Sequence, residues 1–260
     1  MHPFFVIVGC YIPAYGFIIA CGTLFALVLG YVVARHRHFD TNDYCALCGY
    51  GMFGGLIGAK VFYLFTRFQE LDWTLLFDPV YSLSLVHTSG FVVIGGLIGG
   101  GLAISLGSRI HHLKANYLLQ NLIFVLPLCQ GFGRIACFMA GCCYGITYEG
   151  FGAVSFPHYS FAGAGYRFPV QLLSSGMLFF SAIVLYFISS TDYKRYSVYL
   201  YILIYTILRF FLEFLRGDDA ERGVEGFLSP AQQLCVICFV GLVICLEYRL
   251  YFKRSRSKHE

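Results

Sequence analysis

The stretch Tyr11–Ala34, YIPAYGFIIACGTLFALVLGYVVA, contains no charged residue along its whole length. A helix needs roughly 20 mostly apolar residues to cross the hydrocarbon core of a bilayer, so this stretch is long enough to span a membrane. It runs into ARHRH and is too long for the apolar region of a cleavable signal peptide. We therefore expect a transmembrane helix here rather than a leader sequence.

The composition of the whole chain agrees with this expectation. Of 260 residues, 58% are hydrophobic and only 12% are charged, whereas soluble domains carry about 25% charged residues. Long apolar stretches recur along the chain and predict an all-α polytopic membrane protein, a single domain over residues 1–260. We expect seven transmembrane helices, within Tyr11–Ala34, Tyr44–Phe65, the glycine-rich part of Pro79–Ser108 from Gly90 onward, Ala115–Gly133, Phe168–Thr191, Tyr196–Leu215 and Gly226–Leu246.

Basic residues predict how these helices are oriented, because cytoplasmic connections are enriched in Lys and Arg. The basic residues collect in alternate connections and at the carboxyl end, as Arg35, Arg37, Arg109, Lys114, Lys194, Arg195, Arg249, Lys253, Arg254, Arg256 and Lys258. The amino terminus is therefore expected outside and the carboxyl terminus in the cytoplasm. Residues 138–167 then form an outside connection, in which we expect a small extracytoplasmic cap. The net charge of +4 is explained by these basic ends, so no nucleic-acid partner is expected.

Glycines in the second and third predicted helices follow a packing pattern. Gly51/Gly55, Gly54/Gly58, Gly95/Gly99 and Gly96/Gly100 each have the small-xxx-small spacing. This spacing lets two helix backbones approach closely in a membrane. It predicts tight helix packing rather than a catalytic role for most of these glycines.

Charged residues inside two predicted helices require an explanation. Arg134 lies near the outer end of the fourth helix, and Arg209, Glu213 and Arg216 share one face in the outer half of the sixth. A charge near the bilayer centre costs at least ~2.5–3.5 kcal/mol, so such residues usually face a partner or a cavity. Glu213 can pair with Arg209 and Arg216 can extend to the interface, which gives a purely structural alternative.

That structural alternative leaves Arg134 and at least one other arginine without a carboxylate. Guanidinium groups bind phosphate oxygens in a bidentate manner. In an outer leaflet the available phosphate is a phospholipid head group. We therefore predict a site for an anionic phospholipid at these arginines.

The adjacent Cys142 and Cys143 fall in the predicted outside turn, and the residues leave three alternatives open: a vicinal disulfide, reduced turn thiols and a reactive site. The other cysteines are dispersed through apolar stretches, where a free thiol behaves as a small hydrophobe. No Asp/His cluster has the spacing of a two-metal site, so neither a metal nor a cofactor is expected.

Several motifs together resemble one known family. They are IPAYG at Ile12–Gly16, SGFVVIGGLIGG at Ser89–Gly100, GRIACFMAGCCYG at Gly133–Gly145, FPVQLL at Phe168–Leu173, RFFLEFLR at Arg209–Arg216 and LSPAQ at Leu228–Gln232. They resemble the motifs of the bacterial prolipoprotein diacylglyceryl transferases. The resemblance extends through most of the chain, and the signature with the RxxxExxR pattern is its most specific part.

The resemblance implies an enzyme of lipoprotein biosynthesis with seven transmembrane helices, and we expect a monomer in the bacterial cytoplasmic (inner) membrane. Its donor is phosphatidylglycerol and its acceptor the cysteine thiol of a lipoprotein precursor. By resemblance, Arg134 and Arg209 bind the lipid phosphate and stabilise its developing charge, while Glu213 orients Arg209. Tyr15, Gln171 and Arg216 complete the expected phospholipid-binding set.

The chain departs from the family pattern on the acceptor side. Ile94 stands where the family has a histidine thought to act as the base, and Cys137 and Cys142 replace Asn and Glu of the signature. Leu173 and Ser174 replace the Tyr-Glu of another motif.

These departures leave several alternatives open. His87 and His158 could replace the missing base or could be interfacial histidines. Cys142 and Cys143 could act as nucleophiles or carriers. A family transferase with a different envelope acceptor, or a non-catalytic phospholipid-binding membrane protein, are the alternatives for the whole chain.

Overall fold

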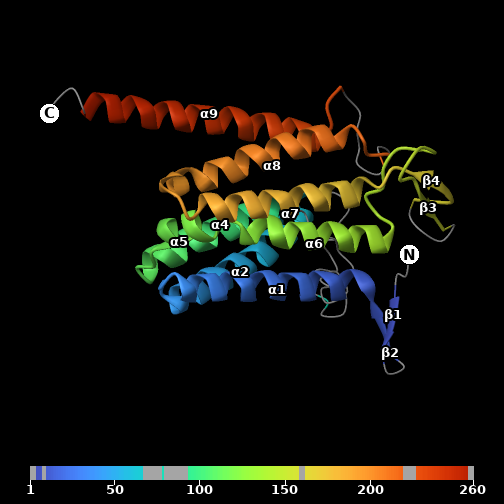
Figure 1. Cartoon of the computed structure of the whole chain (residues 1–260), viewed down its shortest axis with the longest axis horizontal. Helices are drawn as coiled ribbons and strands as arrows, with labels where there is room; N and C mark the ends of the chain where they lie inside the picture. The colour runs from blue at the N-terminus through green and yellow to red at the C-terminus, as the bar shows by residue number, and fades with distance from the viewer. Residues whose placement is uncertain are drawn as a thin grey trace. The chain divides into compact units, whose positions relative to one another are not determined.

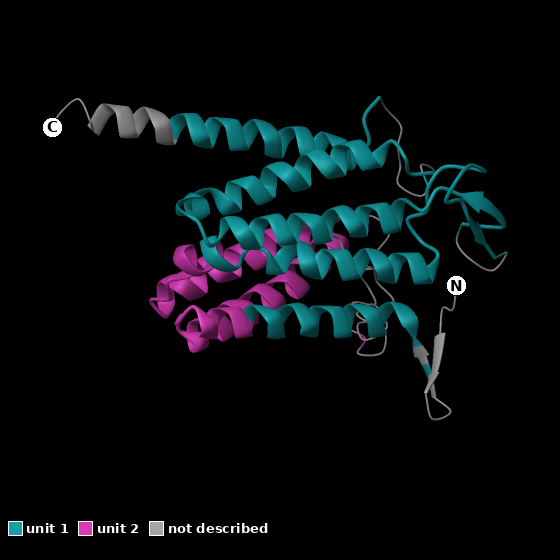
Figure 2. Ribbon diagram, viewed as in Figure 1, with its two compact units in different colours: residues 1–30, 120–260 teal, residues 31–119 magenta. Residues whose placement is uncertain are grey.

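The computed structural model describes residues 4–7, 10–66, 78, 93–157, 162–218 and 227–256. The chain divides into two compact units: unit 1 comprises Met1–Gly30 with Gln120–Glu260, and unit 2 comprises Tyr31–Leu119 (Figure 2). The described residues are mainly helical and include two short antiparallel hairpins (Figure 1).

Unit 1 contains most of the long helices. Its elements are the hairpin β1 (Phe4–Ile7) and β2 (Cys10–Pro13), most of α1 (Ala14–His36), the end of α5 (Ala115–Leu122), α6 (Val125–Ala140), the hairpin β3 (Val154–Phe156) and β4 (Gly165–Arg167), α7 (Val170–Ile188), the 3-10 turn η2 (Asp192–Tyr196), α8 (Ser197–Glu213) and α9 (Pro230–Arg256). In the second hairpin Val154 pairs with Arg167 and Phe156 with Gly165.

An aromatic side chain of α6 joins three helices of unit 1. The Phe132 ring lies edge-on to Phe25 of α1 at 5.8 Å and to Phe179 of α7 at 5.2 Å between centroids. Gly22 of α1 lies directly against Phe132, and Gly131 lies against the Phe179 ring at distances that leave no room for a β-carbon. Small residues therefore bring α1 and α7 close to α6, and aromatic rings fill the remaining space.

The helix directions in unit 1 bring several termini together. Figure 1 shows that α6 and α8 end at the same end of unit 1 at which α1, α7 and α9 begin, beside the β3–β4 hairpin. The opposite end holds the connection from α7 to α8, with Lys194 and Arg195 in η2. Residues far apart in the sequence therefore meet at the first of these ends.

Unit 2 is built on the glycine contacts of α2 (Thr41–Thr66) and α4 (Val93–Ile110). A β-carbon on Gly54 would lie 2.7 Å from the carbonyl oxygen of Gly99, and one on Gly58 would lie 2.8 Å from the Cα of Gly99. A β-carbon on Gly100 would similarly lie 3.0 Å from the carbonyl oxygen of Gly51. The close backbone packing predicted from the small-xxx-small spacing is confirmed.

The described helices are long and apolar enough for a multi-pass membrane protein. Five single helices could cross a bilayer, at Ala14–His36, Thr41–Phe65, Val170–Ile188, Asp192–Glu213 and Pro230–Tyr248, and the pair α5–α6 raises the count to six if it forms one span. This pair is bent by 55°, whereas the sequence predicts one continuous span from Ala115 to Gly133. Pro127 explains the break, because it has no N–H for a hydrogen bond to the carbonyl of Ile123. The count of seven stays a prediction.

Candidate functional site

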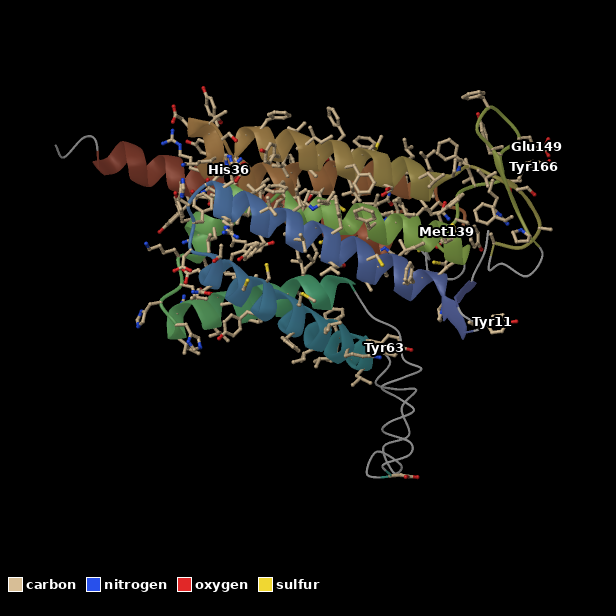
Figure 3. All side chains as sticks on the ribbon, turned by 60° about the horizontal axis from the view of Figure 1, so that its bottom comes forward. Tyr11, His36, Tyr63, Met139, Glu149 and Tyr166 are labelled. Carbon is tan, nitrogen blue, oxygen red and sulfur yellow. The ribbon has the colours of Figure 1, made fainter. Side chains whose placement is uncertain are left out.

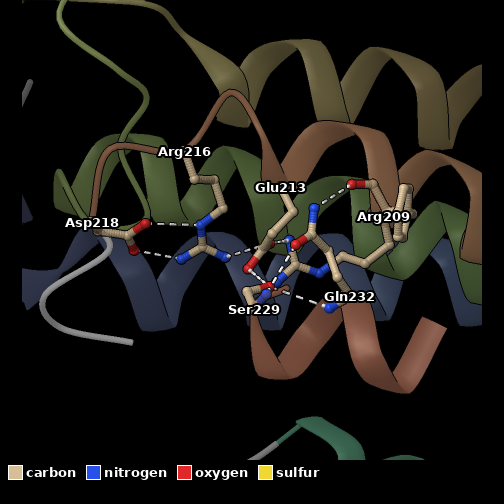
Figure 4. Close-up of polar contacts among 7 residues, drawn as sticks. Arg209, Glu213, Arg216, Asp218, Ser229 and Gln232 are labelled. Carbon is tan, nitrogen blue, oxygen red and sulfur yellow. Dashed lines mark hydrogen bonds and ion pairs between the residues drawn. The ribbon is translucent and has the colours of Figure 1, made fainter. Parts of the chain in front are cut away.

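An ion-pair network lies where α8 ends and α9 begins (Figure 4). Arg209 Nη1 contacts Glu213 Oε2 at 2.5 Å, one helical turn further along α8. The Glu213 side chain is only 2% exposed, and its Oε1 accepts a hydrogen bond of 2.9 Å from the hydroxyl of Ser229. Glu213 is thus held from two helices and in turn fixes the position of Arg209.

Ser229 also organises the start of α9. Its backbone N–H donates to Gln232 Oε1 at 2.9 Å, and its hydroxyl accepts from the backbone N–H of Gln232 at 3.2 Å. This reciprocal pair is a capping box, and Pro230 occupies the first helical position, where a missing N–H has no cost. The SPAQ sequence therefore predicts a helix start, whereas the hydrogen bond from Ser229 to Glu213 could not be predicted from it.

Arg216 has a carboxylate partner, Asp218, that the sequence does not predict. Its Nε and Nη2 contact the two oxygens of Asp218 at 3.0 Å and 2.5 Å. Its Nη1 lies 3.9 Å from Glu213 Oε2, and the side chain is 9% exposed. Arg216 is therefore paired and buried, and the expectation that at least one arginine besides Arg134 lacks a carboxylate is wrong, because Arg209 pairs with Glu213 and Arg216 with Asp218.

Arg134 is the arginine that differs from the others. Within the described residues it has no carboxylate at ion-pair distance, and its charge interacts with those of Arg209, the Tyr15 phenol and the Cys143 thiol. Three guanidinium groups here face two carboxylates, which leaves one net positive charge. Such an excess in a partly buried setting favours binding of an anion.

Two further predicted site residues lie at the same end of unit 1. Tyr15 is in the first turn of α1, and electrostatic interactions connect it with Arg134 and with the thiols of Cys137, Cys142 and Cys143. Gln171 is in the first turn of α7 and is 1% exposed. Its Nε2 donates to the carbonyl of Cys142 at 2.9 Å, while its Oε1 has no hydrogen-bond partner within the described residues.

The turn after α6 brings three cysteines together. Gly141 has φ 73°, and the backbone N–H of Cys142 donates to the carbonyl of Cys137 at 3.2 Å. This pattern is a Schellman motif, which folds the chain back over the last turn of a helix. As a result the sulfur atoms of Cys137, Cys142 and Cys143 all lie within 4.8 Å of one another. We call these three residues the cysteine cluster; all three are free thiols and partly buried.

The cysteine cluster has an uneven distribution of charge. Hydrogen bonds from Cys137 and Cys142 lower the pKa of the Cys143 thiol below its usual value, and the charges of Arg216 and Arg134 lower it further against the effect of burial. The hydrogen bonds with Cys137 and Cys143 have the opposite effect on Cys142, whose pKa is raised. Within the cluster, the pKa of Cys143 is therefore the lowered one and the pKa of Cys142 the raised one.

Backbone contacts hold the turn against the end of α8. Gly217 N–H donates to the Tyr144 carbonyl at 3.0 Å, and Ile146 N–H donates to the Leu215 carbonyl at 3.0 Å. A β-carbon on Gly217 would lie 2.5 Å from the carbonyl oxygen of Gly145, so only glycine fits there. The cysteine cluster and Arg216 are therefore positioned by the same pair of backbone segments.

Residues 138–167, the predicted cap, include the β3–β4 hairpin. Tyr144, Phe156 and Ala162 form a small buried core in it, and the Arg167 guanidinium lies 4.5 Å above the Tyr144 ring. A shallow hollow of about 450 Å³ is lined by Glu149, Gly150, Gly152, Ala153 and Tyr166, of which Figure 3 labels Glu149 and Tyr166. No basic side chain lines this hollow, so it is not the candidate phosphate site.

Three residues of the predicted acceptor side are not placed at this site. His87 and His158 lie outside the described residues. Ile94 lies on α4 in unit 2, and only its backbone is described. Their roles stay predictions.

Comparison with known proteins gives consistent results. The family model "Prolipoprotein diacylglyceryl transferase" matches residues 3–248. The chain is 33% identical over 243 residues to the phosphatidylglycerol–prolipoprotein diacylglyceryl transferase 2 of Clostridium perfringens, covering 92% of this chain and 91% of the relative. It is 31% identical over 238 residues to the Clostridium tetani phosphatidylglycerol–prolipoprotein diacylglyceryl transferase, covering 91% and 92% respectively. A protein of the same name from Clostridioides difficile is 25% identical over 256 residues, covering 98% and 96%.

Proposed function

The chain belongs to the prolipoprotein diacylglyceryl transferase family, and on that premise we propose that it transfers the diacylglyceryl group of phosphatidylglycerol to the cysteine thiol of lipoprotein precursors. The acceptor sulfur attacks the glyceryl carbon that carries the phosphate, and a C–S bond forms as the C–O bond breaks. The electron pair of that C–O bond leaves with glycerol phosphate. The thiol proton is lost before or during the attack.

The observation that carries the proposal is the excess positive charge of Arg134, Arg209 and Arg216 over Glu213 and Asp218. The leaving phosphate gains charge in the transition state, and fixed cations near it lower the barrier. Arg134 and Arg209 are assigned to the phosphate. Arg216 contributes its charge from its pair with Asp218.

Glu213 acts as a positioning residue in this proposal, because its contacts hold Arg209 in one orientation. Tyr15 lines the lipid site. The unpartnered Gln171 Oε1 is suited to accept a hydrogen bond from a hydroxyl of the glycerol head group. Because Gln171 also donates to the Cys142 carbonyl, it connects the lipid site to the cysteine cluster.

The proposal includes seven membrane-spanning helices in a monomer of the bacterial inner membrane, with the amino terminus outside and the carboxyl terminus cytoplasmic. The candidate site and the hairpin of residues 138–167 lie at one end of unit 1, and Lys194 and Arg195 lie at the other. The positive-inside tendency supports a cytoplasmic position for that second end. The candidate site then lies toward the outer leaflet, where lipoprotein precursors arrive.

The proposal is tested with purified protein in phosphatidylglycerol liposomes and a synthetic prolipoprotein peptide, with lipid and peptide products followed by mass spectrometry. We expect release of glycerol phosphate together with a diacylglyceryl group on the peptide cysteine. Release without peptide modification would instead indicate another envelope acceptor. No turnover with retained phosphatidylglycerol binding would indicate a non-catalytic lipid-binding protein.

A further inference from the structure

We propose that Cys137, Cys142 and Cys143 bind a zinc ion whose fourth coordination position receives the acceptor thiol. This inference rests on the proposed function, and it names the group that activates the acceptor in a chain with Ile94 at the position of the family's histidine. Catalytic zinc sites commonly have three protein ligands and one open position. Within the described residues the cysteine cluster has three sulfur ligands, and no histidine or carboxylate joins it.

The geometry of the cysteine cluster is close to that of a zinc site. Three sulfurs at about 2.3 Å from a zinc ion at tetrahedral angles lie about 3.8 Å apart. The sulfurs here all lie within 4.8 Å of one another, so small side-chain rotations bring them to that spacing. The Schellman turn and the Gln171 bond to the Cys142 carbonyl hold the backbone in place. Cys143 has φ 54°, an unfavourable conformation for a residue with a β-carbon.

The surrounding charges also suit a trithiolate zinc site. Three thiolates and one Zn²⁺ carry a net charge of −1, and Arg134 and Arg216 both interact electrostatically with Cys143. This charge balances the one positive charge that the three arginines have in excess of Glu213 and Asp218, so with zinc bound the lipid phosphate is held by its direct contacts with Arg134 and Arg209. Thiolate ligands select soft or borderline metals such as zinc over magnesium or calcium. A bare cation between arginines would be repelled, whereas the anionic zinc–thiolate complex is stabilised by them.

The site is adjacent to the proposed phosphate site. Arg134 and Cys137 are three residues apart on α6, so their side chains lie on neighbouring positions of one helix face. An acceptor sulfur on the metal is thereby close to a lipid phosphate at Arg134. This is the arrangement that an attack on the glyceryl carbon next to that phosphate requires.

The chemical step balances without a redox change. The acceptor thiol binds the zinc and loses its proton to water, because a thiol that coordinates zinc is deprotonated. The metal-bound sulfur attacks the glyceryl carbon, a C–S bond forms, and the C–O electron pair leaves with glycerol phosphate. The product sulfur is an uncharged thioether, a weaker ligand that dissociates and frees the position for the next acceptor.

Two other uses of the cysteine cluster fit less well. A disulfide between two of the cysteines is not formed in the structure, where all three are free thiols, and it would leave too few thiolates to bind a metal. A covalent carrier would place the diacylglyceryl group on an enzyme cysteine as a thioether. A thioether is a very poor leaving group, so that intermediate would trap the enzyme.

Metal content and cobalt spectroscopy test the site without relying on activity. The full chain, purified under reducing conditions and incubated with Zn²⁺, should retain about one zinc ion per chain, measured by elemental mass spectrometry. Co²⁺ in place of zinc should give intense visible and near-ultraviolet bands of tetrahedral thiolate coordination. Cys137→Ser, Cys142→Ser and Cys143→Ser should each greatly reduce both signals, whereas Cys129→Ser, also on α6 and outside the cysteine cluster, should leave them unchanged.

The peptide connects the metal to the acceptor. Adding the prolipoprotein peptide should shift the cobalt spectrum, and the same peptide with its cysteine replaced by serine should not. Chelated protein should lose at least about 100-fold of its peptide lipidation and recover it with Zn²⁺, while its binding to phosphatidylglycerol liposomes is unchanged. Absence of cysteine-dependent metal, a native Cys142–Cys143 disulfide found by mass spectrometry, or full activity after chelation would overturn the inference. Stoichiometric metal without any lipidation would retain the zinc site and reject the transferase proposal.

Discussion

The ion-pair network of α8 and α9 and the cysteine cluster after α6 lie at the same end of unit 1 but relate differently to the family pattern. The network keeps the charged motif and supports it with Glu213 and Ser229. By resemblance, Cys137 and Cys142 of the cysteine cluster stand where the family signature has Asn and Glu. Under the proposals above, binding of the lipid phosphate and activation of the acceptor are separable parts of this molecule, and only the second uses different chemistry.

The largest expected effect concerns the two arginines that are proposed to bind the lipid phosphate. Arg134→Ala and Arg209→Ala should each reduce phospholipid turnover by at least about 10²–10³-fold, because each removes a cation that stabilises the leaving phosphate. Turnover is measured as glycerol phosphate release in liposomes. Arg134→Lys should also be strongly impaired, since an ammonium cannot make the bidentate contact.

A matched control for the arginine variants is Arg195→Ala, at the other end of unit 1, where the guanidinium stacks on the Tyr196 ring. It should retain full activity. Normal turnover in a membrane-inserted Arg134→Ala protein would contradict the phosphate assignment, whatever the cysteine cluster does.

The next effect concerns the residue that holds Arg209. Glu213→Gln keeps the shape of the side chain but leaves the largely buried Arg209 without its countercharge. We expect kcat to fall by roughly 10²-fold, because a misplaced catalytic group commonly costs that much. The affinity for phosphatidylglycerol should fall much less, since the positive charge is still present. Glu247→Gln, an exposed change on α9, is the control, and an equal loss in both variants would rule out a specific role for Glu213.

A smaller effect is expected from the support of Glu213. Ser229→Ala removes a hydrogen bond to a charged group and the cap of α9. Hydrogen bonds to charged groups contribute roughly 1.5–3 kcal/mol, and the lower end of that range corresponds to a fall in kcat of roughly tenfold. Ser229→Thr keeps the hydroxyl and should recover most of the activity, whereas a role limited to the helix cap would lower thermal stability without changing kcat.

Residue spacing explains which parts of this structure the sequence could predict. The glycine contacts of Gly54, Gly58 and Gly99 follow from helical periodicity, and the shared face of Arg209, Glu213 and Arg216 does so as well. The charged residues lie on one helix, and the glycine contacts join two helices that carry the same small-residue spacing. Pro127 is consistent with a break between α5 and α6. The sequence alone, however, does not show whether a proline in an apolar stretch bends the helix or is accommodated in it.

The missed contacts depend on chain segments that leave a helix. Asp218 contacts Arg216 because of the conformation of the chain beyond α8. That segment has no helical periodicity from which the contact could be predicted. Ser229 had a signal in SPAQ as a helix start, yet its contact with Glu213 needed the packing of α9 against α8. In the sequence, Cys137 is only a difference from the family motif. The structure shows that the Schellman turn at Gly141 places it beside Cys142 and Cys143. The prediction that no metal is bound rested on the absence of an Asp/His cluster with two-metal spacing, and it did not consider the three thiols together.

The smallest expected change tests whether the cysteine cluster has replaced the family's base. Without a base or a metal, transfer to a free thiol should rise about tenfold per pH unit below the acceptor pKa of ~8.5, because only the thiolate attacks. A zinc-bound acceptor is already deprotonated near neutrality, so the rate of the native protein should vary less than about threefold between pH 7 and pH 8.5.

Ile94→His restores an imidazole at the family position on α4, and a group with pKa ~6.5 is mostly unprotonated in that range. With zinc in place this change should alter kcat/KM by less than about threefold, because the step that a base assists is already complete. In the chelated protein the same substitution should recover part of the lost lipidation and flatten the steep pH profile. Folding is checked first by thermal unfolding, since an unpartnered imidazole destabilises an apolar helix face. A large increase in kcat/KM for the zinc-loaded Ile94→His protein would mean that the acceptor thiol is not activated at the cysteine cluster. The acceptor side would then have lost the family's base without a replacement.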